Sequence, residues 1–234
     1  MLRNPFYNVK ILENQKGINI SMKVLQEGML ADFLNRFMDI ILLNALWFLC
    51  SLPLFTMGAA TCALYEVTMR FAVYENPAVI RTFFLTFRRC FRKATILFLI
   101  FLGAGMFLIA DLWCAFQWKI RFQFPVVVVI LAVAYFYLAV LSHVFPVLAY
   151  FDTGVRECIR KAFFLSMNNG VFTVFIMVIN LSPVFLFLLL PGYFGQILFM
   201  YLIVGFGGIA MLCSLHLIRL FAPERVKKAE EFYA

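Results

Sequence analysis

Two histidines are the side chains in this sequence with the widest range of chemistry. His143 and His216 lie inside long apolar runs. Each is closer to the C-terminal end of its run, and basic residues come after that end. A histidine at such a position can bind a ligand or relay a proton, and two at one depth in a membrane could share a site. A neutral histidine that hydrogen-bonds between helices is the commoner arrangement, so both interpretations stay open.

The apolar runs contain a few other polar residues. Asp111 is followed by Lys119 and Arg121, which predicts an ion pair at the membrane interface more readily than a proton carrier. Asn44 and Asn180 are typical of side chains that hydrogen-bond between membrane helices. These residues are therefore interpreted first as structural.

Common catalytic motifs are missing from the sequence. It has no HExxH, no nucleotide-binding glycine loop, no GxSxG and no close carboxylate pair within an apolar run. The six cysteines have no CxxC spacing, which is typical of buried or reduced thiols: Cys50, Cys62, Cys90, Cys114, Cys158 and Cys213. We therefore expect no enzymatic activity, no cofactor and no bound metal.

The composition is that of an integral membrane protein. Of the 234 residues, 65% are hydrophobic and 14% are charged, which is too apolar for a soluble protein of this length. The apolar runs lack the alternation of barrel strands, so helices must satisfy the backbone inside a bilayer. Charges interrupt residues 1–32, so no cleavable signal peptide is expected there. The predicted fold is all-α, a polytopic helical membrane protein with five long transmembrane helices and a short return helix.

Five apolar runs are long enough to cross a hydrocarbon core of about 30 Å, which takes roughly 20 helical residues. Before them, apolar side chains recur at helical spacing over residues 18–38, which predicts an interfacial amphipathic helix. Pro191-Gly192 predicts a turn between the last two runs. The runs are residues 39–55, 94–116, 125–150, 171–190 and 195–218. The chain thus divides into an N-terminal arm (1–38), a transmembrane bundle (39–222) and a C-terminal tail (223–234).

The chain is expected to turn back after the first run, within NALWFLCSLPLFTMGAATCALYEV at residues 44–67. Pro53 cannot donate a backbone hydrogen bond, and Gly58 tolerates a turn. The small residues that follow would let a short return helix, residues 58–73, pack closely against the first arm. This helix carries Glu66, so we expect protein to shield it from lipid.

Basic residues predict the topology. The net charge is +8, and most Lys and Arg flank the apolar runs. Five spans with a cytoplasmic C-terminus would leave the basic N-terminal arm outside the cell. A short crossing at 58–73 places the basic loops inside, except for Lys119 and Arg121, so both termini are predicted to be cytoplasmic. The positive charge favours the anionic lipids of the inner leaflet as a partner over nucleic acid.

A basic motif occurs twice. RRCFRKA at 88–94 and RECIRKA at 156–162 match at Arg, Cys, Arg, Lys and Ala, and ERVKKA at 224–229 is a weaker copy. A parallel repeat of helical hairpins would explain the match, and recurrence by composition is the alternative. Orientation in the membrane requires only Lys or Arg in any order, so the shared Cys and Ala favour a docking surface. Its candidate residues are Arg88, Arg89, Arg92, Lys93, Arg156, Arg160 and Lys161.

Residues 74–93 form a basic amphipathic segment. At helical spacing, its phenylalanines fall on one side and its arginines around the other. Such a helix suits the surface of the inner leaflet or the groove of a partner protein. Both interpretations stay open.

Residues around the hairpin resemble a known family. They are Asn44, Trp47, Pro53, Thr56, Gly58 and Tyr65, followed by Phe84, Phe87, Phe91, Ala94, Pro146, Phe151 and Asp152. The pattern resembles the YesL-like bacterial membrane proteins, a domain family of unknown function. Members are typically encoded beside carbohydrate ABC transporters, sensor kinases and glycan-degrading enzymes, so the resemblance implies an auxiliary role in sugar uptake or its control. It supplies no catalytic or ligand residues.

Two functions therefore compete. The chain is an accessory subunit whose basic loops dock onto an ABC transporter or a sensor kinase, or it is a small transporter whose path passes helix breaks at Pro53 and Pro183. Transport requires polar residues from several spans around one cavity, whereas these spans hold isolated ones. The accessory subunit is favoured, and a polar cavity reaching mid-membrane would favour transport.

Overall fold

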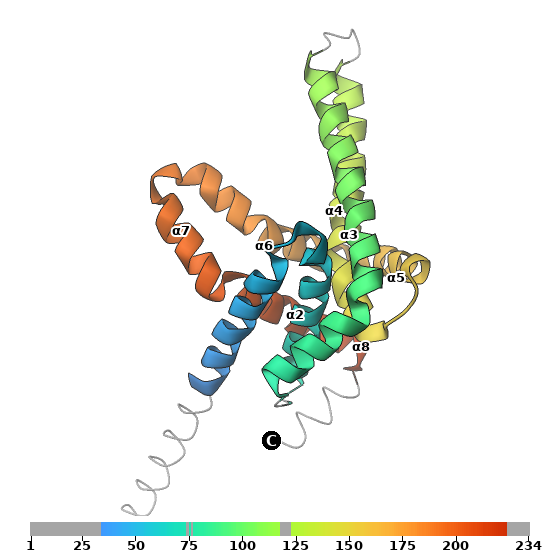
Figure 1. Cartoon of the computed structure of the whole chain (residues 1–234). Helices are drawn as coiled ribbons and strands as arrows, with labels where there is room; N and C mark the ends of the chain where they lie inside the picture. Colours follow the sequence, from blue (N-terminus) through green and yellow to red (C-terminus); the bar gives the residue numbers. More distant parts are fainter. Residues whose placement is uncertain (1–33, 74, 76, 118–122, 224–234) are drawn as a thin grey trace, which may run out of the picture. The chain divides into compact units, whose positions relative to one another are not determined.

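The computed structural model describes residues 34–73, 75, 77–117 and 123–223 (Figure 1), and all regular elements within them are helices. Four are long and apolar enough to cross a membrane: Leu34–Ser51, α3 (Val79–Gln117), α4 (Gln123–Phe151) and α6 (Gly170–Leu189). The all-α membrane fold class is therefore confirmed. Most of the predicted interfacial helix at 18–38, and the third copy of the basic motif at 224–229, lie outside the described residues.

Contacts divide the chain into two units, Met1–Ile40 and Ile41–Ala234. The helices from α2 onward all belong to the second unit, and so do Asn44 and Trp47.

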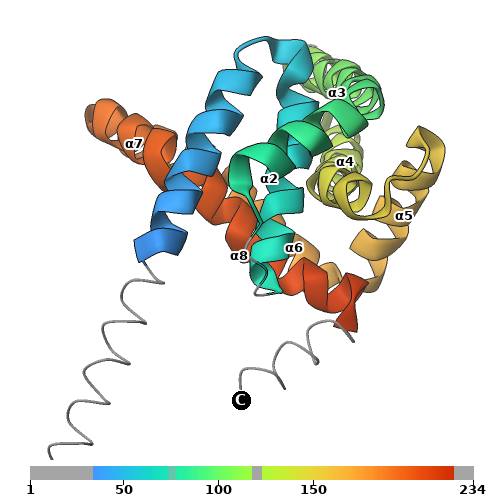
Figure 2. The same cartoon turned by 60° about the horizontal axis from the view of Figure 1, so that its bottom comes forward.

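The predicted return helix is present. After a 3-10 turn at Leu54–Thr56, α2 runs over Met57–Ala72. Its 16 residues extend about 24 Å, which is shorter than the hydrocarbon core. Protein encloses α2, because it packs against α3, α4 and α8 (Figure 2) and most of its residues are buried. The Glu66 side chain is 13% exposed, so it is shielded as expected.

Helix α3 joins two elements that the sequence predicted separately, the basic segment at 74–93 and the span at 94–116. It is one helix of 39 residues, about 58 Å long. Neither Pro nor Gly occurs between residues 79 and 102, so nothing interrupts the backbone hydrogen bonds where the two elements meet. Helices α3 and α4 lie side by side (Figure 1), and the Tyr137 hydroxyl donates to the Phe101 carbonyl at 2.9 Å.

A short helix, α5 (Val155–Asn168), lies between α4 and α6 and carries the second copy of the basic motif. The sequence analysis assigned no helix here. Cys158, Ala162 and Ser166 are the buried residues of α5, and their spacing of four places them on one face. The segment is therefore an amphipathic helix, packed by that face against α4.

Helix α6 continues through Pro183, so the expected helix break at this residue is wrong. Proline lacks the N–H that would bond to the carbonyl of Ile179. The Ser182 hydroxyl donates to that same carbonyl at 2.7 Å. A local hydrogen bond therefore replaces the one that proline removes.

The predicted last span, residues 195–218, is not one regular helix. It consists of α7 (Phe194–Met200), a π-helical turn η3 (Tyr201–Gly205) and α8 (Phe206–Phe221). The chain is bent by 54° here. The described residues therefore contain four candidate spans, or five if the bent pair is one span, and the prediction of five is not confirmed as such.

The turn before this broken helix follows the prediction. Pro191-Gly192 opens a 3-10 turn, η2 (Pro191–Tyr193), between α6 and α7. Proline suits the first position of such a turn for two reasons: its φ angle is already fixed near the helical value, and the N–H that it lacks would have no partner there.

Candidate functional site: a basic surface on α3 and α5

The residues predicted as a structural motif form hydrogen bonds and buried contacts within the hairpin. The Thr56 hydroxyl bonds to the carbonyl of Pro53 at 2.7 Å and closes the turn. The Trp47 indole N–H donates to the Thr61 hydroxyl at 3.1 Å, which ties the first helix to α2. Trp47 and Tyr65 are each 5% exposed. These side chains therefore stabilise the fold and do not form an open site.

Gly58 lies in a different close contact from the one predicted. It lies inside α2, and no described glycine has a positive φ, so the turn does not need its backbone freedom. A Cβ atom at Gly58 would lie 2.6 Å from the Ala94 carbonyl oxygen and 2.9 Å from the Phe98 Cβ. The closest neighbours thus belong to α3, and not to the first arm as expected.

Asn44 bridges helices as predicted. Its side-chain N–H groups donate to the Tyr201 carbonyl at 3.1 Å and to the Leu202 carbonyl, and its oxygen accepts from the Gly207 backbone N–H at 3.0 Å. Both carbonyls belong to the π-helical turn η3, so Asn44 links the first helix to the turn that precedes α8. It therefore fixes the start of α8.

The two histidines have separate partners. His143 is fully buried and its Nδ1 lies 2.9 Å from the Ala139 carbonyl oxygen within α4. His216 stacks on Phe172, with ring centroids 3.5 Å apart. Among the described residues no hydrogen bond or ring contact joins the histidines, so the structure does not bring them together.

The other candidate polar residues are scattered. Asn180 donates to the Ile176 carbonyl at 3.0 Å within its own helix, and its side chain also contacts the Tyr65 hydroxyl on α2. Asp111 lies in α3, whereas its predicted partners Lys119 and Arg121 are outside the described residues. In the part of the chain that the structure describes, no three His, Cys, Asp or Glu side chains are grouped to hold a metal ion.

One pocket lies among the helices, between α2, α3, α4 and α6, with a volume of 290 Å³. Most of its lining is apolar. Four of the lining residues have polar side chains: Thr61, Tyr65, Ser142 and Asn180. Thr61 and Ser142 both donate to backbone carbonyls of their own helices, so few polar groups are left to bind a hydrophilic solute.

The seven predicted docking residues divide into two groups. Arg89 and Lys93 turn toward the protein: the Arg89 guanidinium donates to the Ala149 carbonyl at 3.1 Å and lies 3.6 Å from Glu66, and the Lys93 ammonium lies 2.8 Å from Asp152. Lys161 pairs with Glu157 at 2.9 Å. Arg89 and Lys93 therefore hold α3 to α2 and to the end of α4, whereas Lys161 pairs within α5. All three cations are only partly available to a partner.

The other four docking residues are exposed: Arg88, Arg92, Arg156 and Arg160. The guanidinium of Arg160 lies over the Phe164 ring, 5.7 Å from its centroid. Within the described residues none of the four forms an ion pair. A helical step of about 100° explains the division, because neighbouring positions point to different sides. We call these four arginines the basic surface.

Two acidic anchors of α3 were missed by the sequence analysis. Asp152 follows the last residue of α4 with φ of 45°, a left-handed conformation that Asp tolerates better than most residues. Its carboxylate lies within 4 Å of both Arg89 and Lys93. Glu66 approaches Arg89 from α2. An acidic residue directly after a helix end is a weak signal, and its distant partners cannot be read from the sequence.

The Cys and Ala shared by the two basic motifs are packing residues. Cys90, Ala94, Cys158 and Ala162 are all fully buried. Burial raises the pKa of the Cys158 thiol to about 12, so it stays protonated. Helix packing therefore explains why both motifs contain Cys and Ala, the similarity that had favoured docking. Of the two motifs, the exposed arginines remain as candidates for binding a partner.

Two proteins of Bacillus subtilis are similar to this chain, and a family model matches part of it. Residues 40–112 match a family model described as "Protein of unknown function, DUF624". The chain is 34% identical over 153 residues to Uncharacterized protein YesL of strain 168, which covers 62% of this chain and 71% of that protein. It is 24% identical over 200 residues to Uncharacterized protein YteU of the same strain, which covers 83% and 85%. No solved structure matches the chain.

Proposed function

Because this chain belongs to the YesL-like family DUF624, as the hairpin residues predicted, and that family has no known function, we propose a role from the chain's own surface. The protein is a non-enzymatic accessory subunit of the bacterial cell membrane. It docks through the exposed arginines of α3 onto a carbohydrate ABC transporter or a sugar-sensing kinase.

A single observation carries this proposal. Arg88 and Arg92 are exposed on α3, one helical turn apart, and they line a surface hollow of 500 Å³ together with Phe87, Phe91, Arg89 and Lys93. Their neighbours Arg89 and Lys93 already anchor the helix. The fold therefore leaves two cations beside aromatic rings, the combination that recognises acidic or aromatic groups of a partner.

The interior supports an accessory role over transport. Polar groups that could line a path are used between helices: Asn44 binds the start of α8, and the Thr68 and Ser214 hydroxyls lie 2.7 Å apart. The pocket between α2, α3, α4 and α6 is largely apolar. The class of partner follows from the sugar-uptake systems with which the family is associated.

The topology in this proposal has five long spans, with α7 and α8 as one bent span and α2 as a short crossing. Each copy of the basic motif would then follow a helix that descends to the cytoplasm, as in a repeat of helical hairpins. Two observations support this: one copy of the motif follows α2 and the other follows α4, and the Cys and Ala of both copies are buried.

Both termini are then cytoplasmic, which cysteine labelling would test. Single cysteines placed at positions 10 and 230, in a background without the native six, should resist an impermeant maleimide in intact cells and react after the cells are broken. If position 10 were labelled in intact cells while position 230 was protected, the two termini would lie on opposite sides of the membrane. The chain would then cross it an odd number of times, which would contradict the topology.

Docking is tested with the double variant Arg88→Gln and Arg92→Gln. We expect recovery of the co-expressed transporter or kinase to fall about tenfold, the effect of losing roughly one charged hydrogen bond, and growth on complex glycans to slow. The measurement is co-purification from membranes, quantified by mass spectrometry.

The control for this variant is Arg81→Gln, which removes an exposed arginine from the same helix but outside the hollow. It should leave recovery unchanged. Equal recovery for the double variant and the control, with normal membrane insertion of both, would refute docking through this surface.

A further inference from the structure

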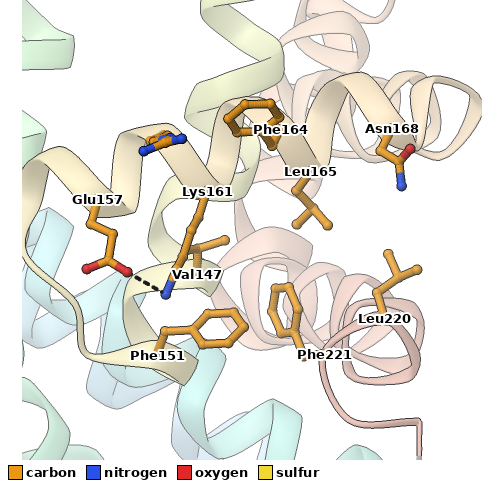
Figure 3. A pocket seen from close by; sticks show the side chains of 10 residues that line it. Val147, Phe151, Glu157, Lys161, Phe164, Leu165, Asn168, Leu220 and Phe221 are labelled. Carbon is orange, nitrogen blue, oxygen red and sulfur yellow. Dashed lines mark ion pairs between the residues drawn. The ribbon is translucent and has the colours of Figure 1, made fainter.

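A pocket of 690 Å³ lies between the end of α4, helix α5 and the end of α8. Figure 3 shows side chains from the three helices facing one another across it. The residues that line it are Val147, Phe151, Glu157, Arg160, Lys161, Phe164, Leu165, Asn168, Leu220 and Phe221. Its volume is that of a small-molecule site.

The lining of the pocket changes along α5 from charged to uncharged residues. Glu157, Lys161 and Leu165 are four residues apart and share one side of the helix, with Lys161 and Leu165 directed toward α4 and α8 (Figure 3). The first part carries two cations and one anion. Beyond Lys161, Leu165 lies opposite Phe221 and Asn168 lies opposite Leu220 (Figure 3). Leu165, Leu220 and Phe221 supply an apolar wall, with the Asn168 amide at its end.

The charged part of the pocket is preorganised. Glu157 holds the Lys161 ammonium at 2.9 Å, and that ammonium lies 4.5 Å from the centroid of the Phe151 ring. Arg160 lies over Phe164 and forms no ion pair within the described residues. The three charged side chains thus leave one net positive charge, which matches a single phosphodiester.

The uncharged end of α5 is the end attached to a candidate span, because α6 begins at Gly170. Nearby, the side chains of Phe163 and Phe164 are 42% and 60% exposed, as expected for an amphipathic helix that contacts the membrane interface. The pocket therefore has its cations and its apolar wall in the order in which a phospholipid presents phosphate and acyl chains.

We propose that this pocket binds one anionic phospholipid. The phosphate accepts hydrogen bonds from Arg160 and Lys161, and an acyl chain lies against Leu165, Leu220 and Phe221. An acidic peptide would match the cations but not the apolar wall, so it is the less suitable occupant. Basic pockets between membrane helices are a recurrent type of site for anionic lipid headgroups.

Native mass spectrometry of the full-length, delipidated protein would test this site with phosphatidylglycerol and phosphatidylcholine of equal chain length. We expect phosphatidylglycerol to bind about tenfold more tightly. Arg160→Gln should weaken its binding about tenfold by removing a charged hydrogen bond. Leu220→Gln should also weaken it, because it places a polar group on the apolar wall.

Arg156→Gln is the matched control, since Arg156 is exposed on the same helix but does not line the pocket. It should leave the affinity for phosphatidylglycerol unchanged. Equal affinity for the two lipids, or equal effects of Arg156→Gln and Arg160→Gln, would overturn the proposal. So would binding of sn-glycerol 3-phosphate as tight as that of the lipid, because the acyl chain would then contribute nothing. Docking rests on Arg88 and Arg92 of α3, so either proposal can fail alone.

Discussion

Replacing Gly58 by leucine is expected to abolish most of the folded protein. The Cβ atom alone would come within 2.6 Å of the Ala94 carbonyl oxygen, and a backbone atom in the middle of α3 cannot move aside as a flexible side chain can. The leucine would therefore push α2 away from α3, its main packing partner. We expect a cost above about 3 kcal/mol, measured as monodisperse yield and melting temperature in detergent.

Gly103→Leu is the control for that change. Gly103 also lies in a helix, but a Cβ atom there has no neighbour within 4 Å. Leucine favours a helix over glycine by about 1 kcal/mol, so yield and melting temperature should stay the same or rise. If Gly58→Leu behaved like Gly103→Leu, the close approach of α2 to α3 would be wrong.

The sequence predicts that Gly58 matters but not which helix it contacts. Pro53, the small residues and the distribution of Lys and Arg all indicate a chain that turns back, and α2 lies where that pattern places it. The contact with Ala94 depends on how α3 crosses α2. Crossing geometry is a tertiary property that no local pattern specifies.

The basic residues show the same limit. Their number and position predict a charged surface, and a helical period alone would have separated Arg88 and Arg92 from Arg89 and Lys93. Which of the two groups faces the protein depends on Asp152, which is 59 positions away from Lys93. Likewise, the pocket beside α5 needs Phe151 and Phe221 from two other helices. Local periodicity defines faces, and only the packing of helices decides which face is free.

Asn44→Leu is expected to have the second large effect, because the replacement keeps the branching and the number of side-chain heavy atoms but removes every hydrogen bond of a residue that is 1% exposed. The carbonyls of Tyr201 and Leu202 and the N–H of Gly207 would all lose their partner. Hydrogen bonds between membrane helices contribute about 0.6 to 2 kcal/mol each, so we expect a loss of about 3 kcal/mol in the free energy of unfolding. Chemical denaturation in mixed micelles would measure it.

Two further variants separate hydrogen bonding from shape at this position. Asn44→Asp keeps the oxygen that accepts from Gly207 but loses the N–H groups that serve the two carbonyls, so it should lose most of the stability that Asn44→Leu loses. Asn180→Leu removes an exposed amide that donates within its own helix and has one further side-chain contact, with Tyr65, and it should cost about 1 kcal/mol. If Asn44→Leu and Asn180→Leu were equally mild, the π-helical turn would not depend on Asn44. A large loss at Asn44 alone would show that the bend before α8 is held from the first helix, by the residue that also begins the hairpin motif.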